Sequence, residues 1–177
     1  MLQFRVNEFG DRLVLPATIE DDSTFDDLMA AGRYRYPDPD ITASTFFPPR
    51  AHHTSSTNDT TDNRRRLAFF WILEVAPGVK MNSDEVIAYI RAYGVLATTF
   101  LEQLTVCAVH PHSPANGRLA AYATARKIGR TEPNWYVPVV YRYNGRSYIE
   151  PHRIDFGFRP GDGFLVRPSI DRAVCLW

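Results

Sequence analysis

The stretch Leu67-Ala-Phe-Phe-Trp-Ile-Leu-Glu-Val75 carries a single charged residue, Glu74, in an otherwise apolar run. A strand covered on one face alternates apolar and polar residues, whereas a strand covered on both faces is apolar throughout. Pro77-Gly78 follows closely and is typical of a turn. The sequence therefore predicts a central strand with both faces covered.

The part of the chain after Pro133 predicts more strands, because it is rich in aromatic and β-branched residues. Asn144-Gly145 separates residues 135–143 from residues 146–149 and is the strongest short signal for a hairpin with a type I′ turn. Further strands are expected at 154–158, 164–167 and 173–177, and a small hairpin at 2–15.

Three capping boxes predict three helices, since in each box a Ser, Thr or Asn precedes an acidic residue by three positions. The pairs are Ser23 with Asp26, Asn82 with Glu85, and Thr99 with Glu102. Glycines at 32 and 94 are placed to end the first two helices, and Pro111 ends the third.

Together these signals predict an α+β fold with a mostly antiparallel sheet, two or three helices and two layers. The 177 residues suit a single domain, which we place at 1–177. Within it, residues 33–66 start proline-rich and continue polar, so they predict an extended loop.

The formal net charge of +0 gives no support to capture of nucleic acid or of an anionic membrane. We interpret Arg64-Arg65-Arg66 as a solvated flank of the apolar strand and not as a phosphate contact. No apolar run approaches the roughly 20 residues that span a bilayer, and residues 1–6 lack the features of a signal peptide. Cys107 and Cys175 are expected to be buried thiols, since two cysteines make no disulfide framework. We therefore expect a cytoplasmic protein.

The feature closest to a metal site is His110-Pro111-His112, with His152 and Asp155 as candidate further ligands. We favour a loop of solvent-facing histidines instead, because helix termination already explains the proline, and we expect no cofactor. The chain has no Gly-x-Ser-x-Gly motif, and Cys107 is expected to be inert within a helix. The sequence thus favours a protein that is not an enzyme, with a metal-dependent hydrolase at His110, His112 and His152 as an alternative.

Aromatic residues and arginines interleave between residues 135 and 159. Trp, Tyr and Arg dominate binding hot spots, although about half of the side chains on such strands must face the core. We expect the binding contacts to be Trp135, Tyr143, Arg146, Tyr148 and Arg159. The sequence therefore predicts a binding or interaction module whose partner is another protein or a second copy. A structural assembly protein of the virion type, whose 33–66 arm contacts neighbouring subunits, is a further alternative.

Several short motifs follow one another in a characteristic order. They are Ala31-Gly32-Arg33-Tyr34-Arg35-Tyr36, Asp40-Ile41-Thr42, Phe47-Pro48, Ser83-Asp84-Glu85-Val86, the segment 97–104, Val137-Pro138-Val139-Val140 and Gly163-Phe164-Leu165-Val166-Arg167. This order resembles a group of small uncharacterised bacterial proteins of the candidate-phylum type, and the resemblance implies a layout without an activity. It also favours a strand at 119–125, where the alanines alone favour a helix.

A second resemblance, to C-type-lectin-like domains, rests on a capped helix, a loop-rich strand region and the closing strand at 163–167. It implies binding through the loop-rich region, although a shared fold does not establish a shared function.

Overall fold

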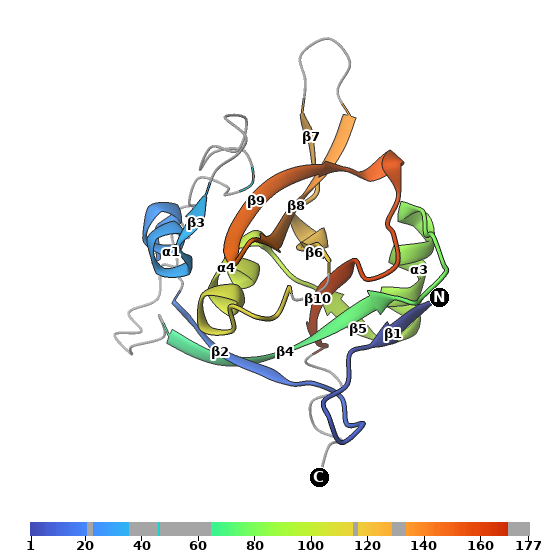
Figure 1. Cartoon of the computed structure of the whole chain (residues 1–177), viewed down its shortest axis with the longest axis horizontal. Helices are drawn as coiled ribbons and strands as arrows, with labels where there is room; N and C mark the ends of the chain where they lie inside the picture. Colours follow the sequence, from blue (N-terminus) through green and yellow to red (C-terminus); the bar gives the residue numbers. More distant parts are fainter. Residues whose placement is uncertain (21–22, 36–45, 47–64, 115–116, 129–133, 170–177) are drawn as a thin grey trace, which may run out of the picture.

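The computed structural model describes residues 1–20, 23–35, 46, 65–114, 117–128 and 134–169 (Figure 1). Its α-helices are α1 (Phe25–Gly32), α3 (Ser83–Ala92) and α4 (Phe100–Val109), and its short 3-10 turns are η1 (Tyr122–Thr124) and η2 (Ile154–Phe156). The strands are β1 (Leu2–Phe4), β2 (Leu15–Glu20), β3 (Tyr34–Arg35), β4 (Arg65–Val75), β5 (Val95–Ala97), β6 (Leu119–Ala120), β7 (Arg126–Ile128), β8 (Asn134–Tyr143), β9 (Arg146–Arg153) and β10 (Gly163–Pro168).

In the described residues the strands form one sheet in the order β1-β4-β10-β6-β8-β9-β3, with β2 beside β4, β5 beside β10 and β7 beside β8. Among these pairs, β10 with β6 and β3 with β9 are parallel, and the others are antiparallel. The expected α+β fold with a mostly antiparallel sheet is confirmed.

β4 is the strand that was predicted to be covered on both faces, and its centre confirms the prediction. Phe70 and Ile72 pack into a core cluster with α1 and α4, whereas Trp71 and Leu73 pack into a second cluster with α3. Figure 1 shows α1 and α4 together on one side of the β2–β4 pair and α3 apart from them. Helices thus cover both faces, and the expected two-layer arrangement is wrong because a strand with two apolar faces needs cover on each.

The capping boxes of α3 and α4 are formed as expected, by Asn82 with Glu85 and by Thr99 with Glu102. In α1 the box lies one residue later, at Thr24 and Asp27. There the backbone N–H of Asp27 donates to the Thr24 hydroxyl, at 3.1 Å. Ser23 and Thr24 are both good caps, so local chemistry alone did not separate them.

The hairpin of β8 and β9 is confirmed, since Tyr143 pairs with Arg146 across Asn144 and Gly145, whose φ angles are 49° and 75°. The expected strand at 154–158 is wrong, because residues 154–156 form η2. The expected hairpin at 2–15 is wrong in part: β1 and β2 both pair with β4 and meet only at a bridge between Val6 and Arg12. The stretch 119–125 is neither one strand nor one helix but β6 followed by η1, and the strand expected at 173–177 lies outside the described residues.

The expected loop at 33–66 is too long at both ends. Tyr34 is buried in β3, where its hydroxyl donates to the Leu104 carbonyl at 3.0 Å. Arg65 and Arg66 begin β4 and pair with β2. Residues 36–45 and 47–64 lie outside the described residues. None of the helices in the described part of the chain is both long and apolar enough to cross a membrane.

Candidate binding site

An open hollow of about 310 Å³ lies where the start of α3, the start of β8 and η2 meet. We call it the Trp135 hollow. Its lining residues are Asn82, Ser83, Asp84, Asn134, Trp135, Ile154 and Asp155. Trp135 is therefore the one sequence-predicted contact that lines it.

The α3 wall of the hollow is fixed by the capping chemistry of the helix. The Asn82 side chain accepts from the backbone N–H of Glu85 at 2.9 Å, and the Glu85 carboxylate accepts from the backbone N–H of Asn82 at 2.8 Å. The next residue, Ser83, shares a hydrogen bond with the hydroxyl of Tyr122 in η1. These bonds hold the first turn of α3 and leave Asp84 exposed.

The opposite wall depends on a close approach of two backbone segments. Met81, just before α3, and Phe158, just after η2, exchange backbone hydrogen bonds of 3.0 and 2.8 Å. Gly157 stands between η2 and Phe158 in the sequence and has a φ of +67°. A Cβ at this position would lie 2.8 Å from the Met81 carbonyl oxygen. Glycine is thus required where the η2 loop meets α3.

Trp135 forms the apolar wall of the hollow and keeps 51% of its surface exposed. The ammonium of Lys127, which pairs with Trp135 across β7 and β8, lies 5.6 Å from the centre of a Trp135 ring. Arg153 forms an ion pair of 2.6 Å with Asp155. The hollow and its rim therefore carry acidic and basic groups together, so no single sign of charge dominates it.

A buried polar cluster lies beneath the loop that carries η2. Arg118 donates two hydrogen bonds to the carboxylate of Asp162, at 3.0 and 2.6 Å, and a third to Nδ1 of His152, at 2.6 Å. His152 then donates from Nε2 to the Gly157 carbonyl at 2.9 Å. The backbone N–H of Arg159 donates to Asp162 at 2.8 Å, so Arg159, a predicted contact, belongs to the same loop.

The cluster shifts the pKa values of its two titratable members downward. Burial lowers the pKa of His152, and the charge of Arg118 adds to this effect. Burial alone would raise the pKa of Asp162, but the hydrogen bonds from Arg118 and Arg159 outweigh it and bring the pKa below 3.8. His152 is therefore a neutral imidazole that positions the loop at neutral pH.

Burial raises the pKa of Tyr122, which bonds to Ser83 at the hollow, and the pKa of Cys107, which lies in the core cluster with α1 and α4. The phenol of Tyr122 therefore stays protonated and cannot serve as a base for Ser83. The expectation that Cys107 is buried is confirmed, and burial raises the pKa of its thiol to about 11, which favours the protonated form. Cys175 lies outside the described residues.

The three histidines that were considered as metal ligands have separate partners. Nε2 of His110 lies 2.8 Å from the Pro16 carbonyl, and Nδ1 of His112 accepts from Arg142 at 2.6 Å. His152 belongs to the cluster described above. His112 is exposed as expected, whereas His110 is half-buried and bonded. In the described residues, no group of three His, Cys, Asp or Glu side chains is placed to hold a metal ion.

The remaining predicted contacts gather at the other end of the β8–β9 hairpin. Tyr143 and Arg146 are exposed beside the turn, and Tyr148 stacks on Tyr141 with ring centres 5.4 Å apart. Trp135 lies eight residues before Tyr143 on the same strand, which corresponds to about 26 Å. The sequence-predicted residues thus form two surfaces.

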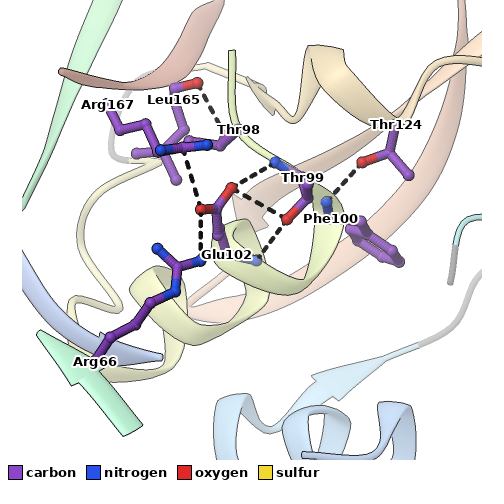
Figure 2. Close-up of polar contacts among 8 residues, drawn as sticks. All are labelled: Arg66, Thr98, Thr99, Phe100, Glu102, Thr124, Leu165 and Arg167. Carbon is purple, nitrogen blue, oxygen red and sulfur yellow. Dashed lines mark hydrogen bonds and ion pairs between the residues drawn. The ribbon is translucent and has the colours of Figure 1, made fainter. Parts of the chain in front are cut away.

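Sequence reasoning missed a second polar cluster, shown in Figure 2. The buried carboxylate of Glu102 accepts from the backbone N–H of Thr99 at 2.8 Å and forms ion pairs of 3.2 Å with Arg66 and 3.4 Å with Arg167. Arg65 pairs with Glu20 at 2.9 Å. Arg65 and Arg66 are both exposed, as expected of a solvated flank, and each also pairs with a carboxylate. Glu102 thus connects α4 with β4 and β10 through ion pairs, so we interpret it as a residue that stabilises the fold.

Comparisons with protein-family models, with curated proteins and with solved structures gave no match. The two resemblances described from the sequence therefore stay hypotheses. The class that the fold and the hollow define is an α+β protein with an open, aromatic-walled site of mixed charge.

Proposed function

We propose that this chain is a non-enzymatic interaction module that binds a partner protein at the Trp135 hollow. The observation that carries the proposal is the half-exposed Trp135 beside polar groups that the capped start of α3 holds in place. A large aromatic ring on a rigid strand loses little entropy on binding, and Trp is the residue type most enriched in hot spots.

A protein partner suits the hollow better than a small ligand does. Small-ligand sites enclose most of their ligand. The Trp135 hollow is open instead, with Trp135 and Ile154 as its apolar lining residues. The exposed Phe156 extends the aromatic surface beyond the hollow, with the guanidinium of Arg153 5.0 Å from its ring centre. Aromatic residues and Arg are enriched in protein interfaces, whereas other polar and charged groups are typical of the interface rim.

The chemistry of the lining indicates which partner side chain enters. The carboxylates of Asp84, which is exposed, and of Asp155, which pairs with Arg153, supply hydrogen-bond acceptors beside the Trp135 ring. A partner side chain with a flat or aliphatic stem therefore packs on the Trp135 ring while its N–H groups donate to these acceptors.

Partner capture from a cell lysate with the immobilised protein tests the proposal. We expect Trp135→Ala to weaken capture about 30-fold, which corresponds to a hot spot of about 2 kcal/mol. The matched control is Tyr143→Ala, which removes an exposed aromatic ring from the other end of the same strand. Equal capture by wild type and Trp135→Ala, with loss in Tyr143→Ala, would move the site to the hairpin turn.

A further inference from the structure

The side chain of His152, near the end of β9, closes the loop that carries η2. Its Nε2 lies 2.9 Å from the carbonyl oxygen of Gly157, the residue directly after η2. The segment between them supplies Ile154 and Asp155 to the lining of the Trp135 hollow. Figure 1 shows the chain running past α3 on its way from β9 to β10. One histidine hydrogen bond therefore spans the loop that forms a wall of the hollow.

The two partners of His152 determine which of its ring nitrogens carries the hydrogen. A guanidinium only donates, so Nδ1 accepts from Arg118, at 2.6 Å. A carbonyl only accepts, so Nε2 carries the hydrogen that bonds to Gly157. Both bonds together require the neutral ring. A proton added at Nδ1 would point an N–H at the N–H of Arg118 and place two positive charges side by side.

The charged groups that face the imidazole are Arg118, just before β6, and Arg159 and Asp162, just before β10. Two positive charges and one negative charge therefore surround His152. Burial is the largest cause of its lowered pKa, and the charges of the two arginines act in the same direction. Asp162 stays ionised while His152 titrates, because its own pKa lies below 3.8. Within this cluster, His152 is thus the group whose charge changes in mild acid.

Arg118 is held more firmly than His152, so the imidazole is the group that moves when it is protonated. The guanidinium donates two hydrogen bonds to the carboxylate of Asp162, at 3.0 and 2.6 Å, and such charge-assisted pairs are strong. The imidazole is a rigid plane that carries both of its bonds. A ring that turns away from Arg118 therefore also leaves the Gly157 carbonyl.

We propose that protonation of His152 releases the loop 153–157 from its place beside α3, so that the Trp135 hollow keeps its shape at neutral pH and loses one wall in acid. A partner bound at the hollow is then released. The release of the loop follows from the geometry of the cluster, whereas its effect on partner binding rests on the proposed function. The hollow is thus controlled by a residue that does not line it.

Amide hydrogen exchange of the wild-type protein, followed by NMR, tests the release of the loop. The reporter is the backbone N–H of Phe158, which donates to the Met81 carbonyl at 2.8 Å. The reference is the backbone N–H of the buried Gln103 in α4, which donates to Thr99 at 3.0 Å. Each rate is divided by the intrinsic rate at the same pH, so that the ratio reports opening of the structure.

We expect the protection of Phe158 to fall at least about threefold from about pH 7 to about pH 5. At about pH 5 it should lie at least about tenfold below the protection of Gln103, because the loop opens while the core stays closed. Unchanged protection of Phe158 would overturn the proposal. Equal protection of the two amides in acid would also overturn it, since the loop would then open only when the whole protein unfolds.

His152→Gln separates protonation of this residue from other effects of pH. The glutamine amide has an oxygen that accepts from Arg118 and a nitrogen that donates to Gly157, and it does not titrate. In this variant the protection of Phe158 should not change between about pH 7 and about pH 5. His112→Gln, which removes an exposed histidine outside the cluster, should behave like wild type. A loss of protection in His152→Gln as large as that in wild type would contradict the assignment.

Capture from a cell lysate at two pH values separates this control from the proposed function itself. The probe is a protein that wild type captures at about pH 7 and Trp135→Ala does not. We expect wild type to retain at least about threefold less of it at about pH 5, and His152→Gln to retain it at both pH values. Equal release from both proteins would overturn control of binding by His152. If no Trp135-dependent protein is captured at neutral pH, the proposed function fails, and the exchange measurement still decides whether the loop is released.

Discussion

Glu102 is a buried carboxylate shared by the first turn of α4 and two arginines, Arg66 and Arg167. Removing one partner of such a buried arrangement leaves charges without compensation, whereas an exposed ion pair contributes little. We expect Glu102→Ala to lower the free energy of unfolding by about 3–5 kcal/mol, measured by urea denaturation. Glu20→Ala, which breaks the exposed pair with Arg65, should cost at most about 1 kcal/mol. Equal costs for the two variants would show that Glu102 is not structural.

His152 makes the stability of the protein depend on pH. Its folded pKa lies below its ordinary value of 6.5, so the unfolded chain binds more protons as the pH falls below that value. Stability should therefore be highest above pH 6.5 and decline as the pH falls toward the lowered pKa, by at most about 1.4 kcal/mol per pH unit. Asp162, whose pKa is also lowered, adds a second loss below its ordinary value of 3.8.

Urea denaturation at several pH values checks this expectation. His152→Gln keeps a hydrogen-bonding side chain but does not titrate, so its stability should change less between about pH 7 and pH 5 than that of wild type. His112→Gln is the control, because His112 is exposed and lies outside the cluster. A pH dependence that is unchanged in His152→Gln and reduced in His112→Gln would contradict the assignment.

Among the elements, η2 and α3 are held together through Gly157, and this contact shapes the hollow. Gly157→Ala combines a left-handed backbone with a Cβ 2.8 Å from the Met81 carbonyl. Gly145→Ala, in the hairpin turn, has a φ of +75° but open space around the new Cβ. We expect thermal unfolding to show a loss of about 1 kcal/mol for Gly145→Ala and a clearly larger loss for Gly157→Ala. Similar losses would mean that the close approach to Met81 carries no cost.

The elements that could be predicted from the sequence are those that depend on local contacts. The caps at Asn82 and Thr99 and the Asn144-Gly145 turn depend on residues only a few positions apart, so local chemistry specifies them. The η2 turn stands where a strand was expected, and Gly157 directly after it meets Met81, a contact across 76 residues that no local pattern reports.

For the whole molecule, the continuous apolar run of β4 was enough to predict a central strand, and both core clusters meet on it. The candidate site was predicted only in part. Trp135 was identified by its residue type, but Asn82 and Asp84 join it through the packing of α3 against η2. Tyr143 was chosen for the same reason, its residue type, but it lies at the far end of β8, away from the hollow. Composition identifies residues suited to binding, whereas the fold decides which of them share a surface.

Site-specific photo-crosslinking in living cells tests whether a partner protein binds at the Trp135 hollow. A photoreactive phenylalanine analogue replaces Trp135 in one variant and Tyr143 in another, and the adducts are identified by mass spectrometry. Both positions are exposed aromatic residues on β8, so they differ mainly in location. We expect the analogue at position 135 to yield one discrete adduct with a partner protein and the analogue at position 143 to yield none. Adducts from position 143 alone, or from neither position, would show that no partner protein binds at the hollow.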